Sequence, residues 1–173
     1  SRQQISWRDA FVIYSKPRVI AMAFLGFSAG LPYLLVFSTL TAWLRDEGIS
    51  KSAIGFFAWV GITYSIKVLW APVVDRLQIP QLTARLGQRR SWILLGQLGI
   101  SLGLLLMSGV GSSNLILLSI CALIVAFASA TQDIAIDAYR IEAVIDEYQG
   151  AMSASYIFGY RVALLAAGAG ALY

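Results

Sequence analysis

The chain alternates between long apolar stretches and short clusters of charge. No charged residue occurs between Arg18 and Arg45, or between Arg90 and Asp133. A membrane-spanning helix needs about 20 mostly apolar residues. The second stretch is about twice that long, and the turn-forming sequence Gly111-Ser112-Ser113-Asn114 lies at its centre. The pattern therefore predicts one spanning helix in the first stretch and two, joined by a turn, in the second.

Two further apolar stretches each contain a single cation, Lys67 in one and Arg161 in the other. We therefore predict an all-α membrane protein with a bundle of about five spans over residues 18–173. The predicted spans cover residues 19–44, 53–74, 91–110, 115–138 and 150–173. Because five is an odd number and the last predicted span ends with the chain, we expect the chain to be part of a longer protein.

Residues 1–17 precede the first predicted span. Ser6 and Asp9 have the spacing of a capping box, which predicts a short helix carrying Trp7, Phe11 and Tyr14. Such a helix suits the membrane surface on the cytoplasmic side. A disordered tail is the alternative.

Composition supports lipid as the surrounding solvent. Hydrophobic residues make up 58% of the chain and charged residues 13%, whereas soluble domains carry about 25% charged residues. Cys121 is the single cysteine and the sequence contains no histidine, which excludes a disulfide within the chain and argues against a His/Cys metal site. We expect no metal and no cofactor.

The basic residues predict the orientation, because cytoplasmic loops are enriched in Lys and Arg. Two cations, Arg45 and Lys51, flank the predicted spans on one side. Nine lie on the other: Arg2, Arg8, Lys16, Arg18, Arg76, Arg85, Arg89, Arg90 and Arg140. We predict a cytoplasmic N-terminus. Topology and contact with anionic lipid explain the net charge of +4, and nothing indicates nucleic-acid binding.

Four charges fall inside the predicted spans: Lys67, Asp133, Asp137 and Arg161. An ionic side chain at the centre of a membrane helix costs about 2.5–3.5 kcal/mol on insertion scales. From the helical rise, Lys67 and Asp133 lie roughly 10 Å, and Arg161 roughly 16 Å, from the cytoplasmic helix ends. Because charged residues inside membrane helices are costly, we predict that these four take part in the function of the protein.

The fourth predicted span carries a polar stripe at helical spacing, formed by Ser129, Gln132, Asp133, Asp137 and Arg140. The two aspartates are i,i+4 neighbours, so mutual repulsion and burial both favour protonation of one of them. In a chain without histidine, this makes Asp133 or Asp137 the candidate proton carrier. The alternative is structural: either aspartate pairs with Arg161 or Lys67 and joins two helices.

Other polar residues are candidates for substrate binding or charge balance. Tyr156 and Tyr160 are i,i+4 neighbours beside Arg161, a set that suits a ligand with carboxylates and a sugar or peptide surface. A buried ion pair is the alternative for Arg161, and a side chain that reaches the membrane surface is the alternative for Lys67. Gln132 completes this group.

Glycines in the first and third predicted spans indicate close helix packing. They form Gly26-x-x-x-Gly30 and Gly99-x-x-x-Gly103. Pro32 follows Gly30 and loosens the first helix, as in the discontinuous helices of many transporters.

The connection between the second and third spans contains a recognisable motif. Ala71-Pro72-Val73-Val74-Asp75-Arg76 ends one span and Gly87-Gln88-Arg89-Arg90 opens the next. This resembles the cytoplasmic loop motif of the major facilitator superfamily, G-x-x-x-D-R-x-G-R-R, with Ala71 in place of the usual glycine and residues 78–86 inserted. By that resemblance, Asp75 holds the helix arrangement, and Arg76, Arg89 and Arg90 latch the gating loop.

Several stretches resemble the AmpG family of muropeptide permeases. The most specific is Ser129-Ala130-Thr131-Gln132-Asp133-Ile134-Ala135-Ile136-Asp137-Ala138. Others are Gly30-Leu31-Pro32, residues 38–44, Ile54-Gly55-Phe56, Lys67-Val68-Leu69-Trp70-Ala71-Pro72 and Gly159-Tyr160-Arg161. A stretch related to residues 129–138 also occurs in endoplasmic-reticulum acetyl-CoA transporters.

The resemblance implies an N-terminal helical bundle of a two-half transporter in the bacterial inner membrane, with the C-terminal half as its partner. Such permeases import N-acetylglucosamine-1,6-anhydro-N-acetylmuramic acid, with or without peptide, for peptidoglycan recycling. Uptake depends on the proton gradient, and the products influence β-lactamase induction and hence β-lactam resistance. Another anionic solute such as acetyl-CoA is the alternative substrate.

Two other classes of protein compete with a transporter. An intramembrane aspartyl protease needs two aspartates on facing helices, whereas Asp133 and Asp137 share one predicted helix and no G-x-G-D motif occurs. A channel or a structural membrane partner is the other alternative. We predict a proton-coupled transporter that works by alternating access and is no enzyme.

Overall fold

The computed structural model describes residues 7–56 and 60–170, and helices form nearly all of it. The first helix, α1 (Trp7–Tyr14), agrees with the predicted short N-terminal helix, although its predicted cap residue Ser6 lies outside the described residues. Pro17 opens α2 (Pro17–Leu34) at a position where a proline ring fits a helix. A π-helical turn, η1 (Leu35–Thr39), and α3 (Leu40–Asp46) continue this helix.

The second predicted span, residues 53–74, is divided. It consists of α4 (Lys51–Phe56), α5 (Val60–Ser65) and α6 (Lys67–Arg76), and residues 57–59 lie outside the described part. Ile66 interrupts the helix with φ −80° and ψ −3°. Lys67 is therefore the first residue of a helix rather than a residue within one.

The remaining helices follow the pattern of charge and turns. They are α7 (Leu82–Leu86), α8 (Gln88–Val110), α9 (Leu115–Glu142), the 3-10 turn η3 (Asp146–Tyr148), α10 (Gln149–Leu165) and the π-helical turn η4 (Ala166–Gly170). Asn114 caps α9, because its side chain accepts a hydrogen bond from the Leu117 amide at 3.1 Å.

Three described helices are long and apolar enough to cross a membrane: Pro17–Asp46, Gln88–Val110 and Leu115–Glu142. The prediction of an all-α membrane protein is confirmed. The number of five spans stays a prediction, because the described residues within 51–76 form short helices and the last predicted span includes residues 171–173, which the structure does not describe.

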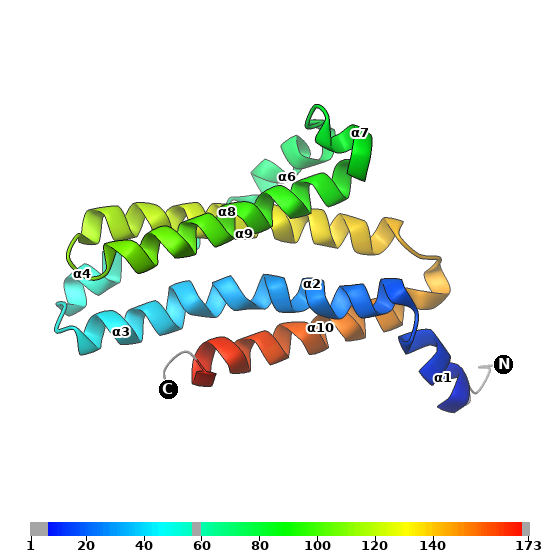
Figure 1. Cartoon of the computed structure of the whole chain (residues 1–173), viewed down its shortest axis with the longest axis horizontal. Coiled ribbons are helices and arrows are strands. Elements are labelled where there is room, and N and C mark those ends of the chain that lie inside the picture. Colours follow the sequence, from blue (N-terminus) through cyan, green and yellow to red (C-terminus); the bar gives the residue numbers. More distant parts are fainter. Residues whose placement is uncertain (1–6, 57–59, 171–173) are drawn as a thin grey trace.

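Two helix pairs make up the bundle. α2 packs along α10, and α8 packs along α9; in Figure 1 the two pairs form two layers, with α6 and α7 beyond α8. A Cβ at Gly159 would lie 1.8 Å from the carbonyl oxygen of Ala23, and one at Gly26 would lie 2.1 Å from that of Tyr156. Only glycine permits this approach, so the predicted packing role of Gly26 is confirmed.

The apolar core lies between these pairs in two clusters. One joins η1 and α3 to α8 and α9, and it includes Val36, Leu40, Leu44, Ile100, Leu118 and Val125. The other lies toward the N-terminal end of α2, and it includes Val19, Met22, Val74, Trp92, Ile136 and Met152. Between the two clusters, α9 passes through the bundle and contacts α2, α5, α6 and α10.

Candidate functional site

The polar stripe of α9 is divided between two environments. Gln132 is fully buried and its amide nitrogen donates to the Ser28 hydroxyl at 3.1 Å, while Gln97 donates to the same hydroxyl at 3.4 Å. This network joins α2, α8 and α9, so the structure places Gln132 among packing contacts. Asp133, one residue further along the helix, points about 100° away from it.

Asp133 lies at the centre of an unusual set of polar atoms. Its Oδ1 is buried and has no hydrogen-bond partner in the described chain, and the same holds for the hydroxyls of Tyr64 and Ser129. The Tyr64 and Ser129 hydroxyls lie close together without hydrogen-bonding geometry, and Asp133 lies near Tyr64. Buried polar groups are almost always satisfied, so three unsatisfied ones together mark a place for a ligand, water or a proton.

Tyrosines from three other helices surround this carboxylate. Tyr64 comes from α5, and Tyr156 and Tyr160 come from α10, with ring centroids 6.1 Å apart. Tyr33 of α2 stacks edge-on against Tyr64 at 5.7 Å. The helices α2, α5, α9 and α10 therefore meet around Asp133. We call the set formed by Asp133 and these tyrosines, Tyr33, Tyr64, Tyr156 and Tyr160, the Asp133 face.

The charges near Asp133 are not paired with it. Lys67 and Asp137 act on Asp133 electrostatically, but Asp137 is exposed and forms an i,i+3 ion pair with Arg140 at 3.5 Å. Among the described residues, no ion pair joins Asp133 or Asp137 to Lys67 or Arg161. The described residues therefore do not form the ion pair with Lys67 or Arg161 that the structural alternative for the aspartates requires.

Arg161 lies next to the Asp133 face rather than within it. Tyr156 and Tyr160 share one side of α10, whereas Arg161 follows one residue later and is exposed. The structure thus brings together Asp133, Tyr156 and Tyr160, with Lys67 in electrostatic range, and leaves Arg161 on an open surface of the bundle.

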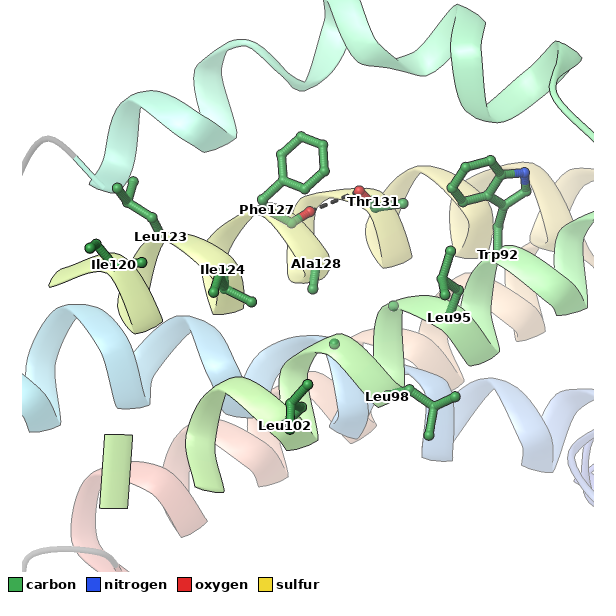
Figure 2. A pocket seen from close by; sticks show the side chains of 12 residues that line it. Trp92, Leu95, Leu98, Leu102, Ile120, Leu123, Ile124, Phe127, Ala128 and Thr131 are labelled. Atoms are coloured by element: carbon green, nitrogen blue, oxygen red, sulfur yellow. Dashed lines mark hydrogen bonds between the residues drawn. The ribbon is translucent and has the colours of Figure 1, made fainter. Parts of the chain in front are cut away.

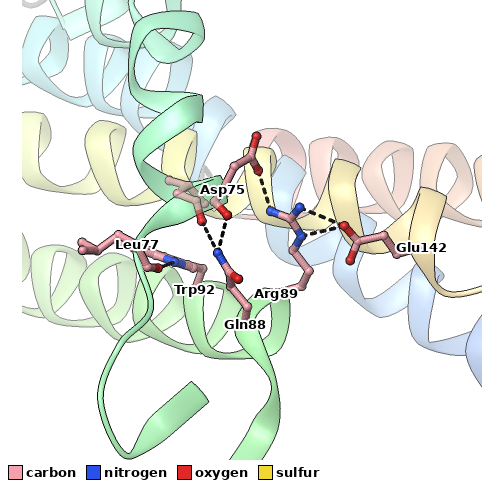
Figure 3. A network of polar contacts seen from close by, with 7 residues as sticks. Asp75, Leu77, Gln88, Arg89, Trp92 and Glu142 are labelled. Atoms are coloured by element: carbon pink, nitrogen blue, oxygen red, sulfur yellow. Dashed lines mark hydrogen bonds and ion pairs between the residues drawn. The ribbon is translucent and has the colours of Figure 1, made fainter. Parts of the chain in front are cut away.

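A second polar cluster lies at the N-terminal end of α8 (Figure 3). The Arg89 guanidinium contacts Asp75 Oδ1 at 2.5 Å and donates twice to Glu142 Oε1, at 2.8 and 3.0 Å. Gln88 donates to the carbonyl oxygens of Val74 and Asp75. This cluster links α6, α8 and the end of α9.

The cluster includes one residue that the sequence motif does not identify. Glu142 lies off the polar stripe of α9. The sequence signal that could have identified it is the group of basic residues at 85–90, which calls for an acidic partner nearby. Arg76 is exposed and takes part in no ion pair with another described residue. The Arg90 guanidinium lies 6.0 Å from the Tyr139 ring centre.

A groove of about 630 Å³ lies between α8 and α9 (Figure 2). Its walls are apolar, and its polar groups are already engaged: the Thr131 hydroxyl donates to the Phe127 carbonyl at 2.8 Å, and the Trp92 indole donates to the Leu77 carbonyl at 3.0 Å. Leu98 and Leu102, on its edge, are more than half exposed. Such a groove suits lipid chains, not a polar solute.

The two π-helical turns face each other. The Thr39 hydroxyl in η1 donates to the carbonyl oxygen of Ala167 in η4 at 2.8 Å. Widened turns of this kind are frequent at functional sites, and here they join the α2–α3 helix to the end of α10.

These features define a class of protein: a multi-pass helical membrane protein with an unsatisfied acidic group at a helix junction. A family model described as acetyl-coenzyme A transporter 1 matches residues 19–120, and the chain belongs to this transporter family. It is also 40% identical over 162 residues to transporter AmpG 4 of Rickettsia conorii, and 36% identical over 162 residues to the anhydromuropeptide permease of Escherichia coli. It is 42% identical over 149 residues to transporter AmpG 1 of Rickettsia typhi.

The alignments cover most of this chain and a minor part of each relative. They include 93%, 93% and 86% of this chain, but 39%, 32% and 34% of the respective relatives. The relatives are named as transporters, which confirms the prediction of a transporter rather than an enzyme and confirms the resemblance to the AmpG family.

Proposed function

We propose that this chain forms the N-terminal part of a proton-coupled importer of anhydromuropeptides. The similarity to the Escherichia coli anhydromuropeptide permease supports the substrate. The observation that carries the mechanism is the buried Oδ1 of Asp133, which has no partner in the described chain. The proposed location is the bacterial inner membrane with a cytoplasmic N-terminus, and the proposed pathway is peptidoglycan recycling.

In this proposal Asp133 carries the proton. An unpaired carboxylate among apolar helices is favoured in its neutral form, and Lys67 offsets the charge when the proton leaves. Asp137 is the weaker candidate, because Arg140 already pairs with it at the exposed end of α9. A change of charge at a junction of four helices alters their preferred packing, which is the coupling that alternating access requires.

The aromatic residues of the Asp133 face are the proposed contacts for substrate. Tyr156 and Tyr160 offer hydroxyls and ring faces to a sugar, and exposed Arg161 is available to a substrate carboxylate or to the C-terminal half. The cluster of Asp75, Arg89 and Glu142 is the proposed latch between the two states of the transporter. This role is supported by the positions of the three side chains, which belong to three different helices.

The test is uptake of labelled anhydromuropeptide by full-length protein in vesicles, with and without an inward proton gradient. We expect Asp133→Asn to abolish gradient-driven accumulation while exchange of substrate across the membrane continues. Asp137→Asn, one helical turn away, is the matched control and should keep accumulation. Full gradient-driven accumulation by Asp133→Asn would exclude the carrier role.

Acetyl-CoA is the second candidate substrate, because the matching family model carries that name. Its phosphates would engage the basic residues instead of the tyrosines. Competition decides between the two: unlabelled acetyl-CoA should leave muropeptide uptake unchanged, and efficient inhibition by acetyl-CoA would reverse the assignment.

A further inference from the structure

A groove of about 450 Å³ lies where α2 begins and α9 gives way to α10. Two cations, Lys16 and Arg18, line its rim, and apolar side chains, including Val19, Val144 and Ile145, line the rest. Val19 is the first residue of the charge-free stretch of α2. The groove therefore lies at the level where the hydrocarbon core of a membrane meets its headgroups.

Contacts with the α9–α10 connection hold both cations in place. The Lys16 ammonium sits 3.6 Å from the centre of the Tyr148 ring, and the Arg18 guanidinium donates to the Ala143 carbonyl at 2.5 Å. A guanidinium has five N–H donors and an ammonium three, so each keeps donors for an anion. No carboxylate belongs to the lining among the residues that the structure describes.

The neighbouring helix α1 offers a surface of the matching kind. Trp7, Phe11 and Val12 are 84%, 75% and 64% exposed. Large apolar side chains on a short helix beside basic residues are typical of segments that lie in the membrane interface. The groove and α1 thus place a cationic rim and an apolar contact surface for a lipid at one end of the bundle.

We propose that this groove binds an anionic phospholipid of the leaflet on the side of the N-terminus. The phosphate lies between Lys16 and Arg18, and the upper acyl chain contacts Val19, Val144 and Ile145. Basic pockets between membrane helices commonly bind lipid headgroups in this way. The site is separate from the Asp133 face, and it does not depend on which solute the protein carries.

The test uses the full-length protein and native mass spectrometry with an equimolar mixture of phosphatidylglycerol and phosphatidylcholine. Each cation near an anionic lipid contributes about five-fold in affinity. Two cations should therefore make the wild type bind phosphatidylglycerol about 25-fold more tightly than phosphatidylcholine. Lys16→Gln combined with Arg18→Gln should remove most of this preference. The charge-conserving pair Lys16→Arg with Arg18→Lys should keep most of it, and this separates loss of charge from misfolding.

The control neutralises two cations on the opposite side of the membrane, Arg45→Gln with Lys51→Gln, and should leave the preference intact. Three results would overturn the proposal: no lipid preference in the wild type, an unchanged preference after neutralisation of Lys16 and Arg18, or an equal loss in the control. Displacement of phosphatidylglycerol by millimolar glycerol phosphate would also overturn the proposal. Such displacement would show that the groove binds a phosphate group and that the acyl chains do not contribute.

Discussion

Replacement of Gly159 by alanine tests the close crossing of α2 and α10. The added Cβ would lie 1.8 Å from the carbonyl oxygen of Ala23. Carbon and oxygen atoms in contact across helices lie about 3.3–3.6 Å apart. α10 must therefore move away from α2 by roughly 1.5 Å or more, because the atom it meets belongs to the backbone and cannot turn aside.

The expected loss of stability follows from two opposing terms. Overpacking of a close interface costs about 1–3 kcal/mol, and a clash with backbone places Gly159→Ala at the upper end. Alanine gains about 1 kcal/mol over glycine in helix propensity. We expect the free energy of unfolding to fall by about 2 kcal/mol in all.

Gly150 provides the matched control, because it lies in the same helix and a Cβ there would meet nothing within 4 Å. Gly150→Ala should be as stable as the wild type or more stable. The measurement is unfolding of the full-length protein in mixed micelles with increasing sodium dodecyl sulfate, followed by tryptophan fluorescence. Equal stability of Gly159→Ala and Gly150→Ala would refute the close crossing of α2 and α10.

Three further substitutions test local interactions. Asn114→Ala should lower the unfolding free energy by about 1 kcal/mol through loss of the α9 cap, and Asn114→Ser should restore most of it in the same unfolding assay. Thr39→Val should cost about 0.6–1.7 kcal/mol, because it removes the hydrogen bond between the π-helical turns; Thr41→Val, whose hydroxyl donates within its own helix, should cost less. Arg89→Gln should reduce vesicle uptake strongly while changing unfolding by less than about 1 kcal/mol, because both acidic partners are about half exposed to solvent, so that the ion pairs are screened. Normal uptake by Arg89→Gln would argue against the latch.

The sequence was sufficient to locate most helices. The charge-free stretches and the turn at 111–114 predict α2, α8 and α9. A helix is expected there because it satisfies every backbone N–H and C=O within one segment, as lipid requires. The interruption at Ile66 and the π-helical turns could not be predicted, because they depend on local backbone geometry that apolar composition does not encode.

Side-chain surroundings were harder to predict than helix positions. Gln132 and Asp133 belong to the same polar stripe, yet one lies in a hydrogen-bonded network and the other beside unsatisfied hydroxyls. A rotation of about 100° per residue separates them, and only the positions of α2, α5 and α8 decide which side each faces. Glu142 was missed for a similar reason: its role as a partner of Arg89 arises from the meeting of distant helix ends.

The distribution of paired and unpaired charge carries the functional argument. Asp75, Arg89 and Glu142, and likewise Asp137 and Arg140, form ion pairs near helix ends, where an unpaired charge would cost little. Asp133 lies further from the helix end, where an isolated charge costs more, and its buried Oδ1 has no partner among the described residues. Selection for stability alone would pair or remove the deep carboxylate first. A carboxylate retained there without a partner is what a reversible proton-binding group requires, since a fixed ion pair would hold it in one charge state.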